Sequence, residues 1–308
     1  MSSENNKIVF VSSIFRDLVA VSSKFPKPGE TIMGSDFFMG FGGKGANQCV
    51  MAAKLGAKTV IVGKVGDDEH GDAYINNLKQ QHVDMRHLGK VSGTSTGIAT
   101  IYVESSSGEN MIVIVPGANA RVTEEDVIKA EEDIAASKAV VATLELSMAA
   151  VKTVMELGRK HGVTTILNAA PARADYGKDI LEAVDILIVN ETEAELLAGT
   201  EDITKCGEVL KDLCRNVIIT LGKDGALLWE QGKSKVKVDI KQLEQKDVVD
   251  TTGAGDAFVG SLSFFLTTRP DLSLPEAVKR SCEVASQSVM KKGTQASYPC
   301  REEVTHLL

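Results

Sequence analysis

The chain has 308 residues, 43% of them hydrophobic, and a formal net charge of −8, and no stretch of it concentrates Lys and Arg. This charge pattern argues against nucleic acid or an anionic membrane as a partner, and the longest apolar runs are far shorter than the roughly 18 to 20 residues of a membrane span. The polar N-terminus lacks a targeting pattern, so we expect a cytoplasmic enzyme, with an organelle pool left open. The five cysteines include no CxxC pair, so we expect reduced thiols.

Short apolar runs alternate along the chain with segments of helical periodicity. The apolar runs predict buried strands at residues 8–12, 59–63, 139–144, 164–168, 185–190 and 216–222. The periodic segments predict helices at residues 46–55, 73–80, 124–135, 148–160, 204–213, 254–267 and 274–290. This alternation predicts an α/β fold with a mostly parallel central sheet that helices cover on both faces.

Two segments break the alternation. Residues 18–41 and 96–115 alternate apolar and polar side chains around the turn clusters KPG and SSSGEN, a pattern typical of antiparallel hairpins. We expect them to form a small β-sheet lid within a single domain that spans residues 1–308.

The glycine-rich stretch GFGGKG at 40–45 matches a dinucleotide-binding string, but its context does not. A dinucleotide fold places these glycines directly after the first strand, where this chain has SIFRD, and a Walker A loop needs Ser or Thr after Lys44. The alternatives that remain are a glycine turn whose free N–H groups and Asn47 meet a polar ligand, and a helix start with glycines for tight packing.

A second glycine motif, VVDTTGAGDAFVG, covers residues 248–260. Gly253 and Gly255 free the backbone to wrap an anion, and Asp256 stands at the positive end of the following helix. An acid that stabilises a helix start explains Asp256 but not the glycines, so we favour an anion hole with an acid beside it. Between the two motifs, NETEAEL at 190–196 predicts a capping box of Asn190 and Glu193 at the start of another helix.

The chain resembles the ribokinase-type (PfkB) carbohydrate kinases over essentially its whole length. GGKGANQ at 42–48 and DTTGAGDAFVG at 250–260 are similar to the two signatures of this family, and FPKPGET, NETEAE, ITLGKDGA and KKGTQASYP stand in the same order. The resemblance implies a homodimer, formed through the lid, in which ATP phosphorylates O5 of D-ribose with the help of Mg²⁺ and K⁺. The alternatives are a kinase of another sugar, deoxyribose or nucleoside, and a non-catalytic sugar or nucleotide sensor.

The resemblance also implies residue roles. Asp256 is the implied general base, and the implied catalytic turn is Gly253, Ala254 and Gly255, whose amides, with that of Asp256, form the anion hole. The implied sugar-binding residues are Asp17, Gly43, Lys44, Gly45, Ala46, Asn47, Glu145 and Asp256. The implied nucleotide-binding residues are Asn190, Thr220, Leu221, Gly222, Lys223, Asp224, Gly225, Gly255 and Cys282. The implied potassium site comprises Asp250, Thr252, Ser288, Lys291, Gly293 and Ser297, and Glu193 is the acid associated with magnesium.

Two further expectations concern the base and the sugar. The helix N-terminus should favour the ionised form of Asp256, and the weak base that results is adequate because phosphoryl transfer has a loose transition state. Residues 12–17 are SSIFRD where the family pattern is G-S-x-N-x-D, so Ser12 and Phe15 depart from it while Asp17 is kept. These departures leave the sugar preference open.

Overall fold

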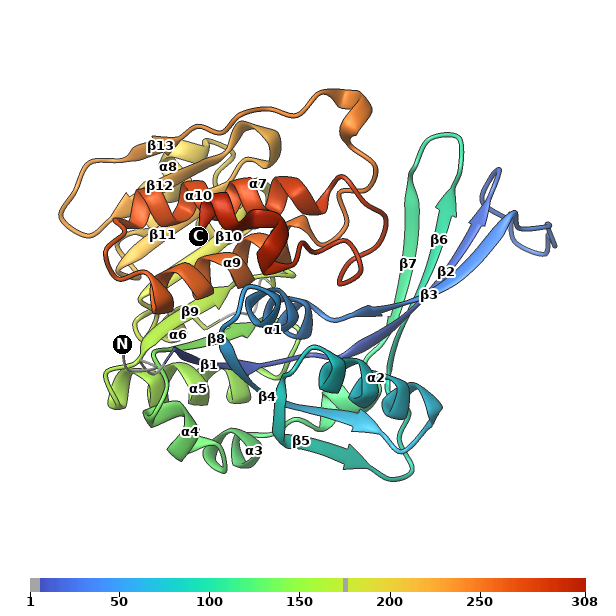
Figure 1. Cartoon of the computed structure of the whole chain (residues 1–308), viewed down its shortest axis with the longest axis horizontal. Coiled ribbons are helices and arrows are strands. Elements are labelled where there is room, and N and C mark those ends of the chain that lie inside the picture. Colours follow the sequence, from blue (N-terminus) through green and yellow to red (C-terminus); the bar gives the residue numbers. More distant parts are fainter. Residues whose placement is uncertain (1–5, 174–176) are drawn as a thin grey trace.

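The computed structural model describes residues 6–173 and 177–308, and in it a large sheet has the strand order β13-β12-β11-β10-β9-β8-β1-β4-β5 (Figure 1). From β11 to β5 all neighbours are parallel, whereas β12 and β13 add antiparallel pairs at one edge. The strands are β1 (Lys7–Val11), β4 (Lys58–Gly66), β5 (Asp84–Val91), β8 (Ala139–Thr143), β9 (Thr164–Asn168), β10 (Ile186–Asn190), β11 (Asn216–Thr220), β12 (Ala226–Glu230) and β13 (Val236–Val238). The predicted α/β fold is confirmed.

Helices cover both faces of this sheet (Figure 1). One face carries α1 (Lys44–Lys54), α2 (Glu69–Gln80), α9 (Ala254–Thr268) and α10 (Leu274–Ser288). The other carries α3 (Glu124–Ile128), α4 (Glu131–Ala135), α5 (Met148–Lys160), α6 (Lys178–Leu181), α7 (Glu191–Ala198) and α8 (Ile203–Leu210). Because side chains alternate along a strand, Ile8 and Phe10 enter one core and Val9 and Val11 the other, which explains the continuous apolar runs.

A second, four-stranded sheet projects from the side of the large one (Figure 1). It consists of β2 (Phe15–Ser22), β3 (Asp36–Gly42), β6 (Gly97–Glu104) and β7 (Asn110–Val115) in the order β3-β2-β6-β7. The two predicted hairpins are its antiparallel pairs, and β2 joins them by a parallel pairing with β6. The second small sheet is thus confirmed; its action as a lid stays a prediction.

Short 3-10 segments complete the described part at Gly117–Arg121, Gly222–Asp224, Gln245–Asp247 and Arg301–Leu307. Within that part, no helix has the length and apolar character needed to cross a membrane.

The prediction of one helix over residues 124–135 is wrong, since α3 and α4 meet there at a turn. Asp133 of α4 accepts bonds from Lys7 Nζ of β1 and His87 Nε2 of β5, each at 2.8 Å, and these contacts direct the second helix toward the sheet. The pattern also does not predict β5, β12 or β13. These strands lie at or next to a sheet edge, where β5 in particular mixes polar with apolar residues.

Candidate active site

The site lies at the edge where the parallel strands of the large sheet end. Register places Thr143, Asn168 and Ile188 beside one another on β8, β9 and β10, and Asn190 beside Thr220 on β10 and β11. Helices α1 and α9 start at this same edge. In open parallel sheets, ligands bind outside the carboxyl ends of the strands, so this edge is where the predicted site residues should meet.

Asp256 is buried in the first turn of α9, which begins after Gly253 with its positive φ of 79°. Its Oδ2 accepts a hydrogen bond from Asn47 Nδ2 and its Oδ1 one from Gln48 Nε2, both at 3.0 Å. Burial raises the pKa of Asp256, and Lys44, Asn47 and Gln48 offset only part of this rise. Desolvation thus acts against the ionised form of Asp256, which the helix end is expected to favour.

A network of buried side chains holds Asn47 in turn. Gln295 Nε2 donates to Asn47 Oδ1 at 2.9 Å and lies 2.8 Å from the hydroxyl of Tyr74, which donates to the carbonyl oxygen of Gly42 at 2.6 Å. Sequence reasoning missed both Gln48 and Gln295, although each stands inside a motif that carries the family resemblance.

Two carboxylates, Asp17 of β2 and Glu145 after β8, line the side of the site next to the small sheet. A Cβ on Gly42 would lie 2.3 Å from Asp17 Oδ1, so glycine at this position leaves room for the carboxylate. Burial, reinforced by Glu145, raises the pKa of Asp17 to about 7. Glu145 Oε2 accepts from Lys44 N at 2.8 Å and from Ser13 Oγ, and burial raises the pKa of Glu145 as well. The pair offers acceptors suited to hydroxyl groups.

Lys44 brings positive charge into this acidic setting. Burial lowers the pKa of Lys44, but the charges of Asp256, Glu145 and Glu193 more than offset this effect and raise it overall. Lys44 therefore stays protonated and relieves repulsion among the carboxylates.

The glycines around Lys44 serve close packing. Gly43 has a φ of 96°, and a Cβ there would lie 2.5 Å from the carbonyl oxygen of Ser13. A Cβ on Gly45 would lie 2.7 Å from Ser12 Cα, and Ala46 is fully buried in the core. The sequence left two alternatives for this turn, which are tight packing at a helix start and the approach of a ligand. The two can hold together, because close packing of the glycines does not exclude a ligand.

The two residues that depart from the family pattern are both buried. Ser12 lies against Gly45, and Phe15 packs against Gly97 at the start of the small sheet. Asn119 fixes the backbone between them, since its Oδ1 accepts from Ile14 N at 2.8 Å and its Nδ2 donates to Ile14 O at 2.7 Å.

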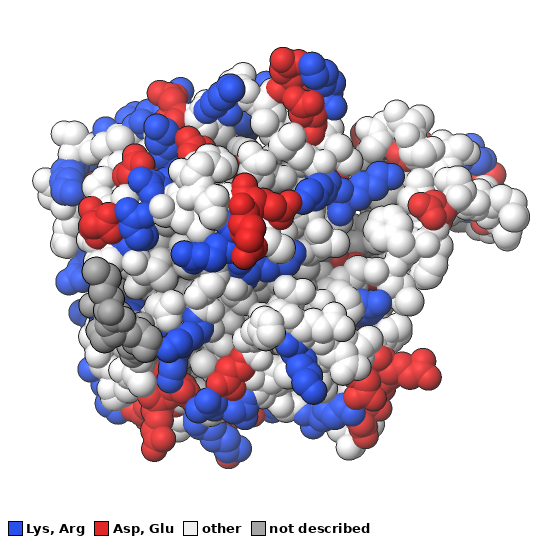
Figure 2. All heavy atoms as spheres, in the orientation of Figure 1, with Lys and Arg blue, Asp and Glu red and all other residues white. Residues whose placement is uncertain are grey.

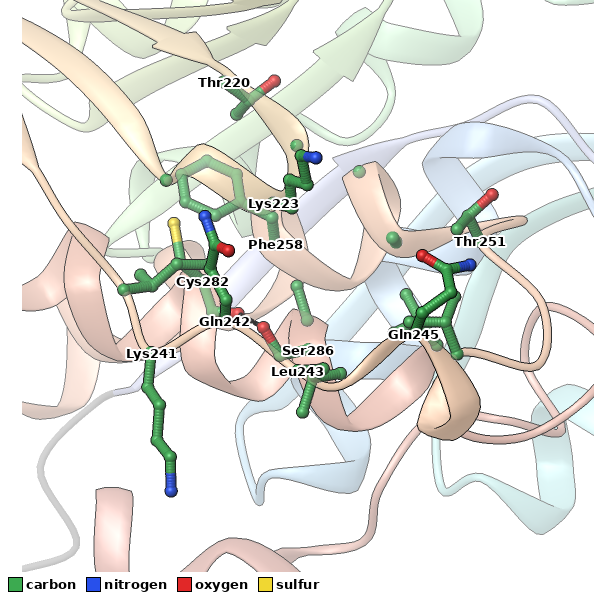
Figure 3. Close-up of a pocket in the computed structure, with 18 residues that line it drawn as sticks. Thr220, Lys223, Lys241, Gln242, Leu243, Gln245, Thr251, Phe258, Cys282 and Ser286 are labelled. Carbon is green, nitrogen blue, oxygen red and sulfur yellow. Dashed lines mark hydrogen bonds between the residues drawn. The ribbon is translucent and has the colours of Figure 1, made fainter.

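A cavity of about 460 Å³ opens beside the N-terminus of α9 (Figure 3). Figure 3 shows it between the end of β11, the loop that carries Gln242 and Gln245, and the helices that carry Phe258 and Cys282. The predicted residues that line it are Thr220, Gly222, Lys223, Gly225, Ala254, Gly255 and Cys282. Its apolar lining residues Ile240, Leu243, Val248, Phe258, Ala285 and Val289 were not predicted. An elongated ligand with an apolar end and an anionic end suits this cavity.

Three residues predicted at the nucleotide are absent from the described lining of the cavity. Asn190 forms the predicted capping box, in which its Oδ1 accepts from Glu193 N at 2.8 Å and its own N donates to Glu193 Oε2 at 2.9 Å. Asp224 Oδ1 accepts from Gln242 Nε2 at 3.0 Å and so orients a residue that lines the cavity. Leu221 packs against the core on the far face of the sheet.

Asp250 joins the two loops of the predicted potassium site. Its Oδ1 accepts from Thr252 N and its Oδ2 from Gly293 N, both at 2.9 Å. Ser288 and Ser297 are buried at either end of the second loop, whereas Lys291 Nζ pairs with Glu303 at 2.7 Å. Among the described residues, no three acidic, His or Cys side chains are arranged to hold a metal ion.

Comparisons with known proteins show the family and the fold to which the chain is similar. The model of the pfkB family carbohydrate kinases matches residues 5–301. The chain is 45% identical to a ribokinase of Mus musculus over 96% of this chain and 93% of that protein, and 37% identical to a deoxyribokinase of Salmonella typhi over 98% of each. The structure of Arabidopsis thaliana ribokinase complexed with ribose and ATP is similar with a TM-score of 0.87, at 30% identity and with 98% of both chains covered.

Proposed function

The chain belongs to the pfkB family of carbohydrate kinases, and from this premise we propose that it transfers the γ-phosphoryl group of ATP to O5 of D-ribose, giving ribose 5-phosphate. One observation carries the proposal. The first turn of α9 holds both Gly255, which lines the nucleotide-sized cavity, and Asp256, whose carboxylate is bonded to Asn47 on the side of Asp17 and Glu145. A phosphoryl donor on one side of this turn and a polyol on the other would meet at Asp256.

The roles of the residues follow from this arrangement. Asp17, Glu145 and Lys44 would fix the sugar through its other hydroxyls, so that the reacting hydroxyl faces Asp256. The amide of Ala254 donates to Thr251 O at 3.3 Å, so the amides of Gly255 and Asp256 at the helix start are the ones that would stabilise charge on the transferring phosphoryl group. Since this transition state is loose, Asp256 needs only to accept the hydroxyl proton as the bond to phosphorus forms.

Two cations fit the residues near this turn. Glu193 is buried, and its carboxylate would supply a hard oxygen ligand to a magnesium ion that also binds nucleotide phosphates, which would offset the cost of burying its charge. The loops that Asp250 ties together, with Ser288, Gly293 and Ser297, offer main-chain oxygens of the kind that suits K⁺. Both ions would supply positive charge that balances the phosphates.

A kinase assay over a panel of sugars tests the proposal. We expect D-ribose with ATP and Mg²⁺ to give the highest kcat/KM among pentoses, hexoses and nucleosides, and a higher rate in K⁺ than in Na⁺. A preference for 2-deoxyribose would instead move the chain toward the activity named for its Salmonella relative. Ribose binding in calorimetry without any product would support a sensor.

We also propose that the chain forms a homodimer through the small sheet. All six residues of β7 are exposed, and so are large apolar side chains of β3 and β6. Figure 2 shows the projecting sheet as a mostly uncharged lobe. The exposed large apolar residues are Phe37, Phe38, Met39, Tyr102, Met111, Ile112, Val113, Ile114 and Val115. Exposed apolar side chains in this number mark an interface, and we infer that a second copy of the sheet covers them.

Charged substitutions on β7 should convert the dimer to a monomer. Because strand residues alternate between faces, Ile112→Glu and Val113→Glu place one carboxylate on each face of the sheet. Light scattering at micromolar concentration should show a dimer for the unaltered chain. It should show a monomer for whichever of the two variants has its carboxylate on the face that contacts the second copy. Leu196→Glu, at an exposed position on α7, is the matched control and should stay dimeric. An unaltered chain that is monomeric, or two dimeric β7 variants, would refute the interface.

A further inference from the structure

Gln48 links the carboxylate of Asp256 to the interior of the large sheet. Its Nε2 donates to Asp256 Oδ1 and to Asn168 Oδ1, each at 3.0 Å. Asn168 stands at the end of β9, and its Nδ2 donates to Ile188 O of β10 at 3.2 Å. A continuous series of hydrogen bonds therefore runs from the first turn of α9 through α1 to two central strands.

The side-chain oxygen of Gln48 has no hydrogen-bond partner among the described residues. The side chain is fully buried, and its Oε1 meets no hydrogen-bond donor among the described residues. A buried carbonyl without a partner destabilises a fold, and an apolar side chain of similar length would avoid this. Fold stability therefore does not explain a glutamine here, whereas the need for two N–H donors toward Asp256 and Asn168 does.

The backbone around Gln48 is fixed as firmly as its side chain. Gly260 of α9 faces α1, and a Cβ on it would lie 2.5 Å from Gln48 O. The two helices therefore touch at Gln48, one turn along α9 from Asp256. With both the backbone and the far donor fixed, Gln48 can restrict rotation of the Asp256 carboxylate.

We propose that Gln48 is a positioning residue for Asp256, holding its carboxylate plane so that the remaining lone pairs face the reacting hydroxyl. The inference rests on the proposed function, in which Asp256 is the base. Asn47 also bonds Asp256, but it is an implied sugar ligand, so its loss would weaken sugar binding too. Gln48 points to the sheet, and its loss should affect the chemical step alone.

The hydrogen bond from Gln48 also favours the ionised base. Together with Lys44 and Asn47 it lowers the pKa of Asp256, against burial and the nearby carboxylates of Asp17, Glu145 and Glu193. Removing Gln48 should raise the pKa of Asp256 further. Since activity requires the ionised form, the loss of kcat at low pH should then begin at a higher pH.

Gln48→Met tests the role with little change in side-chain volume. We expect kcat to fall about 10- to 10²-fold, the value of one bond to a charged group, and the acid limb of the kcat profile to move to higher pH. KM for ribose and for ATP should change less than about threefold, because no ligand contact is lost. Asn168→Leu should produce a smaller change of the same kind, and the double variant should be less than additive.

Gln48→Glu is the second variant, close in shape and usable if Gln48→Met does not fold. A second carboxyl beside Asp256 should move the acid limb to higher pH still. Unchanged kcat and pH profile in the folded variants, with Asp256→Asn inactive, would overturn the positioning role alone. Full turnover by Asp256→Asn would overturn the assignment of the base and the positioning role with it.

Discussion

Asp256→Asn should lower kcat by about 10² to 10⁴ while the protein stays folded. An amide cannot accept the hydroxyl proton, and its single oxygen can keep only one of the two bonds that Asn47 and Gln48 donate at 3.0 Å. Burial raises the pKa of Asp256, which means that its charge destabilises the fold above the pKa of the unfolded chain. The loss of this buried charge should offset the lost hydrogen bond, so the neutral variant should melt at about the same temperature as the unaltered chain at pH 8. Steady-state kinetics and calorimetry check both parts.

A matched control separates catalysis from the ordinary role of an acid at a helix start. Asp72 lies in the first turn of α2, as Asp256 does in α9, but it is exposed and pairs with Lys90 on the surface. Asp72→Asn removes the same interaction with the helix dipole, worth about 0.3 to 1 kcal/mol, far from the site. Its turnover should be unchanged. Equal turnover in both variants would show that Asp256 is only a helix-stabilising acid.

Apolar patterning predicts the fold well because most central strands are buried on both faces. It fails at β5, whose sequence DMRHLGKV has no continuous apolar run, and at the α3–α4 turn, where Asp133 pairs with two distant strands. Neither failure is explained by the intrinsic strand or helix propensity of the residues. In both places the structure depends on contacts with residues far along the chain, which periodicity does not record.

Within the site, motifs predict the residues whose chemistry is visible in the sequence. Asp256 and Lys44 are charged groups in glycine-rich turns, Glu145 is implied by the family resemblance, and the structure brings the three together. Gln48 is a buried residue of α1, and the sequence does not reveal which groups its side-chain amide contacts. The apolar cavity lining from residues 240–248 escapes prediction because that loop has no periodic pattern.

Gly255→Ala should abolish most activity while making the protein no less stable. A Cβ there would meet no atom of the described residues within 4 Å, because Gly255 is exposed to the cavity beside the proposed phosphate site. Alanine favours the helix by up to about 1 kcal/mol relative to glycine. Its methyl group would, however, occupy the space that the transferring phosphoryl group needs. A misplacement of this size should lower kcat/KM for ATP by roughly 10²-fold or more.

Gly260→Ala, on the same helix, should instead destabilise the protein. Its Cβ would lie 2.5 Å from Gln48 O and 2.7 Å from Met51 Cβ, so α1 and α9 would have to separate, at a cost of about 1 to 3 kcal/mol in the free energy of unfolding. Thermal melts of both variants therefore distinguish a glycine kept for its ligand from one kept for packing, and ATP kinetics of Gly255→Ala test the phosphate site. A Gly255→Ala protein with full activity would mean that the phosphoryl group lies elsewhere, since nothing in the fold then requires glycine at position 255.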